Sequence, residues 1–477
     1  METLEKPRSP ARKVPLDGWS IAAGGGASSV DDLNRIGRTM LDTAICARAS
    51  HDGKAAMAGE DASSPGMRRP EREWLADAEQ AFRQATAADA SNVDLHRKLG
   101  LVLIHAGKCE EAIHTLNTAV RLAPDNADLS MLLADAQRTG GDYDAAVDTL
   151  QQFVAREPGN VHARLLLFAM LYIQGDHLRA WTEYECRVQA YSSDFPQPLW
   201  DGSPLDGRTI LLDAEQGLGD QVQFIRYARL VKERGGRVVV KCSRNLYRLL
   251  LTCDGVDEVI PPGEELPPFD CRIWLLSLPH VLGTTQDSVP ARVPYVHADP
   301  HQVERWQGIL GRFPGLRIGI HWAGNLENRA GLDRQLPLSC FFPLARIPGV
   351  QLFSLQKGAG ADALDERPED LSLPSLGPYF KDLQDTAAAV TALDLVITND
   401  TSIAHLVGAL GKPVWVVLPR QECWRWQRDR DDCLWYPTMR LFRRGWNASW
   451  DETFAGVDAA LRDVLAGRAA MHAGVDA

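Results

Sequence analysis

The sequence lacks several features that would assign its 477 residues to a well-marked class. It contains no run of eighteen apolar residues, and its first twenty residues lack the apolar core of a signal peptide, so neither a membrane span nor secretion is expected. Its nine cysteines form no CxxC pair and no His/Cys spacing of a zinc site, which predicts reduced thiols and no metal site. We therefore expect a soluble, cytoplasmic protein.

Basic residues are outnumbered as well. Lys and Arg total 51 against 63 Asp and Glu, a net charge of −12. Nucleic acids and anionic membranes repel an acidic protein, so general binding to either is disfavoured, although a local basic pocket remains compatible with this charge. With 45% apolar residues the chain can bury several cores, and two or three domains are expected.

Residues 1–72 are predicted to form a weakly structured leader of little functional content. A glycine run at 24–26 and a Ser/Pro/Gly cluster at 63–66 bracket one candidate helix, around 30–48, whose apolar residues recur at helical spacing.

A 34-residue period follows the leader. The columns that repeat are glycines, alanines and large apolar residues, among them Gly107, Gly141 and Gly175, and Ala112, Ala146 and Ala180. This period and these residue types are typical of tetratricopeptide (TPR) repeats, which we predict over 73–193 as three full repeats preceded by a partial one. Such helical solenoids usually bind a peptide or protein, but a structural spacer or dimerisation arm remains an alternative.

The pattern then changes to alternating strands and helices. Predicted strands at 208–213, 237–241, 258–260 and 270–276 form one α/β half, 205–305. Strands at 316–322 and 350–355, a weaker one near Tyr379, and the strand–helix–strand unit 393–418 form a second half, 312–470. Alternation of this kind predicts two parallel sheets, whose ligands bind at the carboxyl ends of the strands in a shared cleft.

The unit 393–418 holds the most informative polar residues. Asp400, Thr401 and Ser402 stand at the N-terminus of its helix, where unpaired amides and the helix dipole suit a phosphate or diphosphate. His405 lies one turn further on and roughly the same face. From spacing alone, a helix cap with a packed histidine is an equally good interpretation.

Polar residues also follow the other predicted strands. They are Gly217, Gly219 and Asp220 in the first half, and Asn325, Arg334, Gln356 and Lys357 in the second. Each has an ordinary interpretation as a turn, a cap or a solvated charge, but their shared place at strand ends favours a site.

Several motifs carry a family resemblance. The runs 211–220, 321–325, 354–358 and 400–413, with the tail residues 424–426 and 435–437, resemble the bacterial tetratricopeptide-containing glycosyltransferases related to heptosyltransferases. The resemblance implies a GT-B fold of two Rossmann-like α/β domains, with the nucleotide-sugar held mainly by the C-terminal one. It also implies inverting, metal-independent transfer, with no cofactor because the nucleotide-sugar is a substrate.

The resemblance also suggests roles for the residues. Asp220 matches the family's catalytic aspartate and is the candidate base for an acceptor hydroxyl, with Gly217 and Gly219 shaping its turn. The donor side comprises Asn325, Arg334, Gln356, Lys357, Asp400, Thr401, Ser402 and His405. Of these, Arg334, Lys357 and the helix amides at 401–402 are expected to hold the diphosphate.

Three questions stay open at this stage. The acceptor is either a protein or peptide, as the repeats suggest, or a glycan or glycolipid. A non-catalytic TPR scaffold that senses a nucleotide-sugar is one alternative function. Another nucleotide-sugar enzyme, such as an epimerase, is a second.

Overall fold

The computed structural model describes residues 29–49, 71–190, 195–324, 334–420, 423–445 and 448–473. The chain divides into two compact units, Met1–Leu132 and Leu133–Ala477. The division falls inside a repeat helix, so the last repeat belongs to the same unit as both α/β halves.

The first unit is an array of helices. They are α1 (Val30–Ala49), α2 (Glu71–Ala88), α3 (Val93–His105), α4 (Cys109–Leu122) and the start of α5 (Ala127–Thr139). Gly107, Gly141 and Gly175 have φ angles of 74°, 89° and 90°, which explains why glycine recurs every 34 residues. Each lies at the turn that joins the two helices of a repeat.

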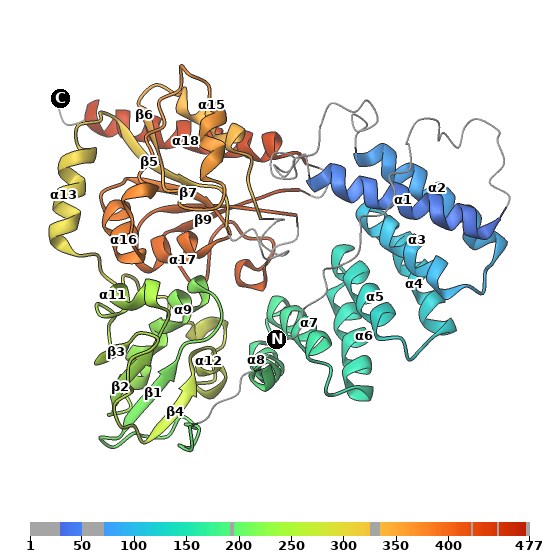
Figure 1. The fold of residues 1–477 in the computed structure, drawn as a ribbon, viewed down its shortest axis with the longest axis horizontal. Coiled ribbons are helices and arrows are strands. Elements are labelled where there is room, and N and C mark those ends of the chain that lie inside the picture. The colour runs from blue at the N-terminus through green and yellow to red at the C-terminus, as the bar shows by residue number, and fades with distance from the viewer. Residues whose placement is uncertain are drawn as a thin grey trace, which may run out of the picture. The chain divides into compact units, whose positions relative to one another are not determined.

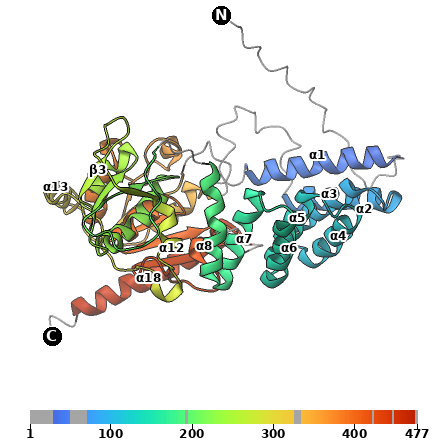
Figure 2. The same ribbon diagram turned by 90° about the horizontal axis from the view of Figure 1, so that it is seen from below.

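Helix α1 packs as the first helix of an additional repeat, beside α2 (Figure 2). A Cβ atom on Gly37 would lie 2.8 Å from the Phe82 ring, just as one on Gly100 would lie 2.5 Å from Leu116. Phe82 precedes Leu116 by one 34-residue period, so the two contacts are equivalent. The helix expected around 30–48 is therefore present, and it is packed against α2. The other leader residues, 1–28 and 50–70, lie outside the described residues.

The second unit begins with the rest of α5 and the last helices of the repeats. These are α6 (Tyr143–Arg156), α7 (Val161–Gln174) and α8 (His177–Tyr184), followed by the 3₁₀ helix η3 (Glu185–Ala190). Their buried side chains are continuous with the core of the α/β halves.

The first α/β half has a four-stranded parallel sheet of order β3-β2-β1-β4. Its strands are β1 (Thr209–Asp213), β2 (Arg237–Lys241), β3 (Glu258–Ile260) and β4 (Cys271–Trp274). The helical segment between β1 and β2 is divided into α9 (Leu218–Phe224), a 3₁₀ turn at 225–227, and α10 (Ala228–Lys232). Helix α11 (Tyr247–Leu250) follows β2, and α12 (Leu278–Val281) follows β4.

The second half has a five-stranded parallel sheet of order β6-β5-β7-β8-β9. Its strands are β5 (Leu316–His321), β6 (Val350–Ser354), β7 (Leu395–Asn399), β8 (Val414–Leu418) and β9 (Met439–Arg443). Its helices are α13 (Pro300–Leu310), α15 (Phe342–Ala345), α16 (Leu383–Thr391), α17 (Ser402–Ala409) and α18 (Trp450–Ala473).

Two details of this half differ from the sequence prediction. The weak strand expected near Tyr379 is a 3₁₀ turn, η10 (Gly377–Tyr379), because Pro378 offers no N–H to a strand ladder. Strand β9 and helix α18 were not predicted. The fold class itself is confirmed: TPR helices precede two Rossmann-like α/β domains with parallel sheets, the GT-B arrangement.

Candidate functional site

The two α/β halves meet where α9 packs against α17 (Figure 1). Helix α9 follows β1 and α17 follows β7, so the contact joins the carboxyl ends of both sheets, where ligands of such folds bind. A Cβ atom on Gly219 would lie 2.8 Å from His405 Cδ2 and 3.3 Å from the Ser402 Cα. Gly219 therefore permits a backbone approach that any side chain would obstruct.

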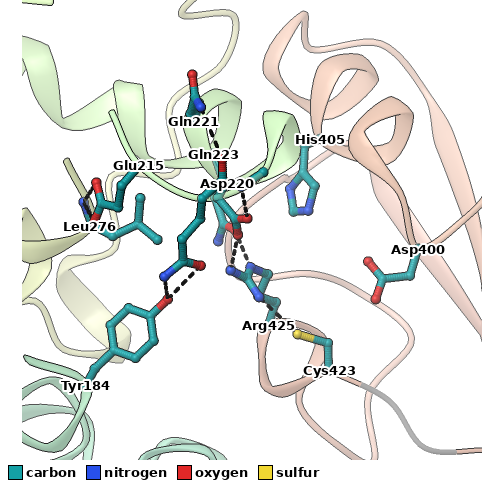
Figure 3. Close-up of polar contacts among 12 residues, drawn as sticks. Tyr184, Glu215, Asp220, Gln221, Gln223, Leu276, Asp400, His405, Cys423 and Arg425 are labelled. Atoms are coloured by element: carbon teal, nitrogen blue, oxygen red, sulfur yellow. Dashed lines mark hydrogen bonds and ion pairs between the residues drawn. The ribbon is translucent and has the colours of Figure 1, made fainter. Parts of the chain in front are cut away.

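Asp220 lies at this contact, in the first turn of α9 (Figure 3). One carboxylate oxygen accepts a hydrogen bond from the Gly217 N–H at 3.0 Å. The other is paired with the guanidinium of Arg425, and the Asp220 side chain is 22% exposed. Each oxygen keeps a further lone pair, so the carboxylate is held in place and can still accept a proton.

Arg425 brings a cation to this carboxylate from the C-terminal half. It lies in the 3₁₀ helix η11 (Trp424–Trp426), and it also donates to Gln223 Oε1 at 2.7 Å and to Cys423 Sγ at 3.1 Å. Burial lowers the pKa of the guanidinium, but Cys423 and Asp220 outweigh this effect and the pKa lies above its ordinary value. Arg425 belongs to the segment 424–426 that carries part of the family resemblance, but the sequence predicts no role for it.

His405 is buried behind Gly219. Its Nδ1 lies 2.9 Å from the Tyr436 hydroxyl, and its ring stacks on Trp426 at 5.4 Å between centroids. Burial, together with the charges of Arg425 and other arginines, lowers the pKa of His405 well below 6.5. The imidazole is therefore neutral at neutral pH. It packs against Tyr436 and Trp426 on one side and lies next to Gly219 on the other.

The N-terminus of α17 holds the predicted phosphate-binding group. Asp400 is 5% exposed, and its Oδ2 lies 3.5 Å from Arg334 Nη1. Thr401 occupies the N-cap position without a side-chain hydrogen bond to the helix, and its hydroxyl lies 3.4 Å from His321 Nδ1. Ser402 is the first residue of α17 and is partly exposed. The Thr401 hydroxyl therefore does not cap α17, although a helix cap was the ordinary interpretation of this segment.

Two other predicted residues are engaged with the backbone. The Gln356 amide oxygen accepts from the N–H groups of Trp322 and Ala323, both at 3.1 Å, and its nitrogen donates to the carbonyls of Ala323 and Ala359. Gln356 therefore fixes the loop after β5. The Lys357 ammonium donates to the carbonyls at 380 and 381.

Asn325, the remaining donor-side residue of the sequence prediction, lies outside the described residues. The structure thus brings together Gly217, Gly219 and Asp220 with Ser402 and His405. It adds Arg425 to them.

A ligand-sized cavity of about 680 Å³ lies between α13 and the segment 374–385. Its lining includes Trp306, Phe353 and Tyr379 but none of the predicted site residues. Among the described residues, no group of three or more His, Cys, Asp or Glu side chains is arranged to hold a metal ion. None of the helices in the described part of the chain is long and apolar enough to cross a membrane.

Part of the chain matches a known repeat family, and a tandem α/β module follows that part. The tetratricopeptide repeat family matches residues 73–127, 103–160 and 131–194, which confirms the repeats predicted from the 34-residue period.

The chain is also similar to one curated protein and to solved structures. Protein FlbA of Caulobacter vibrioides is 27% identical over 421 residues, which are 81% of this chain and 70% of FlbA. Among solved structures, Escherichia coli ADP-heptose lps heptosyltransferase II matches with 14% identity over 55% of this chain and 99% of that chain, with a TM-score of 0.41. A glycosyl transferase of family 9 from Veillonella parvula matches with 12% identity over 53% and 91%, with a TM-score of 0.40.

Proposed function

We propose that the protein is a glycosyltransferase that moves a sugar from a nucleotide-sugar donor to an acceptor hydroxyl. One observation carries the proposal: Asp220 at the start of α9 lies against the N-terminus of α17, through Gly219 and His405. A carboxylate on one side and helix amides with a cation on the other are what this transfer requires.

Each step can be assigned to a group. Asp220 accepts the proton of the acceptor hydroxyl, whose oxygen forms a bond to the anomeric carbon. The bond from that carbon to the diphosphate breaks, and the nucleoside diphosphate leaves with the electron pair. The N-terminus of α17 and Arg334, which is 37% exposed, stabilise the charge on the leaving diphosphate. Transfer is then inverting, because one displacement occurs at the anomeric carbon, and it needs no metal.

The chemical class of the acceptor is inferred from the repeats and not from the residues of the site. A protein or peptide hydroxyl suits a chain whose first half is a TPR array, since such arrays commonly bind peptides. A glycan or glycolipid hydroxyl is the second acceptor class. In either case the acceptor oxygen must reach Asp220.

The Asp220–Arg425 pair is also the observation that favours a non-catalytic, nucleotide-sugar-sensing module. An ion pair between Asp220 and Arg425 is also what a purely structural contact would provide, in a module that binds a nucleotide-sugar without transferring it. The same experiment therefore has to decide between the two functions.

The experiment has a binding arm and a transfer arm. Calorimetry with UDP, GDP, ADP and CMP identifies the nucleotide, and release of that nucleotide from its sugar conjugates is followed with peptide, glycan and glycolipid acceptors. We expect Asp220→Asn to lower transfer about 100- to 10,000-fold while nucleotide affinity stays unchanged. The matched control is Asp206→Asn, at an exposed position of the same half.

Three results would contradict the proposal. Undiminished transfer by Asp220→Asn would remove Asp220 as the base. If none of the four nucleotides bound, the proposed glycosyltransferase activity would be refuted. Nucleotide binding without transfer to any acceptor class would favour the sensing module.

A further inference from the structure

The last repeat is joined to the first α/β half by buried polar contacts. The Trp181 indole N–H donates to the Thr284 carbonyl at 3.0 Å. Arg187, only 4% exposed, donates to Glu215 Oε1 and to the Ser277 hydroxyl, both at 2.9 Å. Buried contacts of this kind are costly to break, because each would leave a charged or polar group without a partner. The last repeat is thus fixed to the module that carries the site.

An aromatic cluster extends this junction to the site itself. We use the term aromatic cluster for Phe168 and Tyr172 of α7, Trp181 and Tyr184 of α8, and Trp424 of η11. Ring centroids of the four repeat residues lie 4.9, 4.7, 5.6 and 6.3 Å from that of Trp424, respectively. Trp424 is adjacent in sequence to Arg425, so the repeat side chains hold the element that carries the cation.

The same cluster contacts the element that carries the carboxylate. The Trp181 ring lies 6.2 Å from that of Phe224, at an interplanar angle of 88°. Phe224 ends α9, the helix whose first turn contains Asp220. Trp181 therefore touches both elements that form the Asp220–Arg425 pair.

Tyr184 adds a third contact, to the turn before α9. Its hydroxyl lies 3.3 Å from Oε1 and 3.1 Å from Nε2 of Gln216, which has a φ angle of 65° and precedes Gly217. Burial raises the pKa of Tyr184 to about 12, so the hydroxyl keeps its proton at neutral pH. This turn supplies the Gly217 N–H that orients Asp220.

We propose that α7 and α8 form a positioning element of the candidate site, acting through the aromatic cluster to hold Asp220 and Arg425 together. Arg425 is a positioning residue: it orients the Asp220 carboxylate and does not itself exchange a proton. The last repeat thus serves transfer directly, in addition to any docking of a partner by the array. The consequence for transfer rests on the proposed function, whereas the mechanical coupling does not.

The test uses the full chain with Trp181→Leu, and with Tyr184→Phe as a milder change that keeps the ring and removes only the hydroxyl. The control is Phe269→Leu, which removes an aromatic partner 5.4 Å from Phe195, outside the cluster. Hydrogen–deuterium exchange is measured on peptides covering 217–224 and 423–427 in the protein without ligand. Transfer and nucleotide affinity are measured with whichever of UDP, GDP, ADP or CMP binds.

We expect Trp181→Leu to speed exchange in both peptides and to lower kcat about ten- to a hundredfold, with nucleotide affinity unchanged. Tyr184→Phe should change 217–224 more than 423–427, and Phe269→Leu should change neither. Trp424→Phe, which keeps an aromatic ring in the cluster, should retain more activity than Trp424→Leu.

Unchanged exchange in Trp181→Leu would overturn the proposal, as would faster exchange with an unchanged kcat. An equal loss in Phe269→Leu would show a general loss of stability instead of positioning, and would also overturn it. If the wild-type protein transfers no sugar, the proposed function fails, and the exchange data alone then decide whether the repeat positions the two elements.

Discussion

Replacing Gly219 by alanine tests the contact between α9 and α17. The added Cβ would lie 2.8 Å from His405 Cδ2, whereas ordinary contacts begin near 3.4 Å, so one helix must move by about 0.6 Å. The His405 side chain cannot easily move away, because its ring is hydrogen-bonded to Tyr436 and stacked on Trp426. Overpacking of this kind costs about 1–3 kcal/mol, and the better helix propensity of alanine offsets about 0.5–1 kcal/mol of it.

The expected result is a net loss of stability together with weaker function. Chemical denaturation followed by tryptophan fluorescence should show an earlier transition for Gly219→Ala, and transfer should fall because Asp220 shifts relative to α17. Gly308→Ala is the matched control, since nothing lies within 4 Å of a Cβ at this exposed position of α13. That control should be neutral or slightly stabilising. A Gly219→Ala protein as stable and active as the Gly308→Ala protein would refute the close approach.

Two further predictions concern other parts of the chain. Burial lowers the pKa of His321 to about 4 from 6.5, so its contribution to stability is present above pH 6.5 and is lost as the pH falls toward 4. At pH 5 this loss of folding free energy is about 2 kcal/mol, and the His321→Gln protein should not show it. The denaturation midpoint of both proteins is measured against pH, and parallel profiles would contradict the prediction. Gly37→Ala should destabilise the first unit by about 1–3 kcal/mol, measured by helical circular dichroism during denaturation, because its Cβ meets Phe82. A stabilising effect would instead mean that α1 is not packed as a repeat helix.

Features with a local signature could be predicted from the sequence. The glycines at 107, 141 and 175 have positive φ angles, which few other residues adopt, so their period marks the repeats. Buried parallel strands read as continuous apolar runs, which placed both sheets. Strand β9 was missed, although Arg440 and Arg443 are its only charged residues and its other three are apolar.

The pairing of Arg425 with Asp220 had no such signature, because the two residues are far apart in sequence and nothing local specifies that they meet. Gln356 and Lys357 illustrate the opposite difficulty. A polar residue after a strand can face a ligand or bond to the neighbouring loops, and only the positions of the carbonyl groups around it decide which occurs. For Gln356, both the oxygen and the nitrogen of the side-chain amide are hydrogen-bonded to the backbone of loop residues 322–323 and 359.

The buried junction at Arg187 has a consequence for how this chain could have been assembled. A sequence boundary drawn at the end of the last repeat would cut between Arg187 and Glu215 and would strip Trp424 of its neighbours. A module inherited or exchanged by itself would therefore have to carry α7 and α8 with it. The repeats before α5 belong to a separate compact unit, so we expect that their number can change without disturbing the site. Relatives that share this site are expected to vary in the number of repeats before α5 and to keep the final ones, and comparing their lengths upstream of that point would test this.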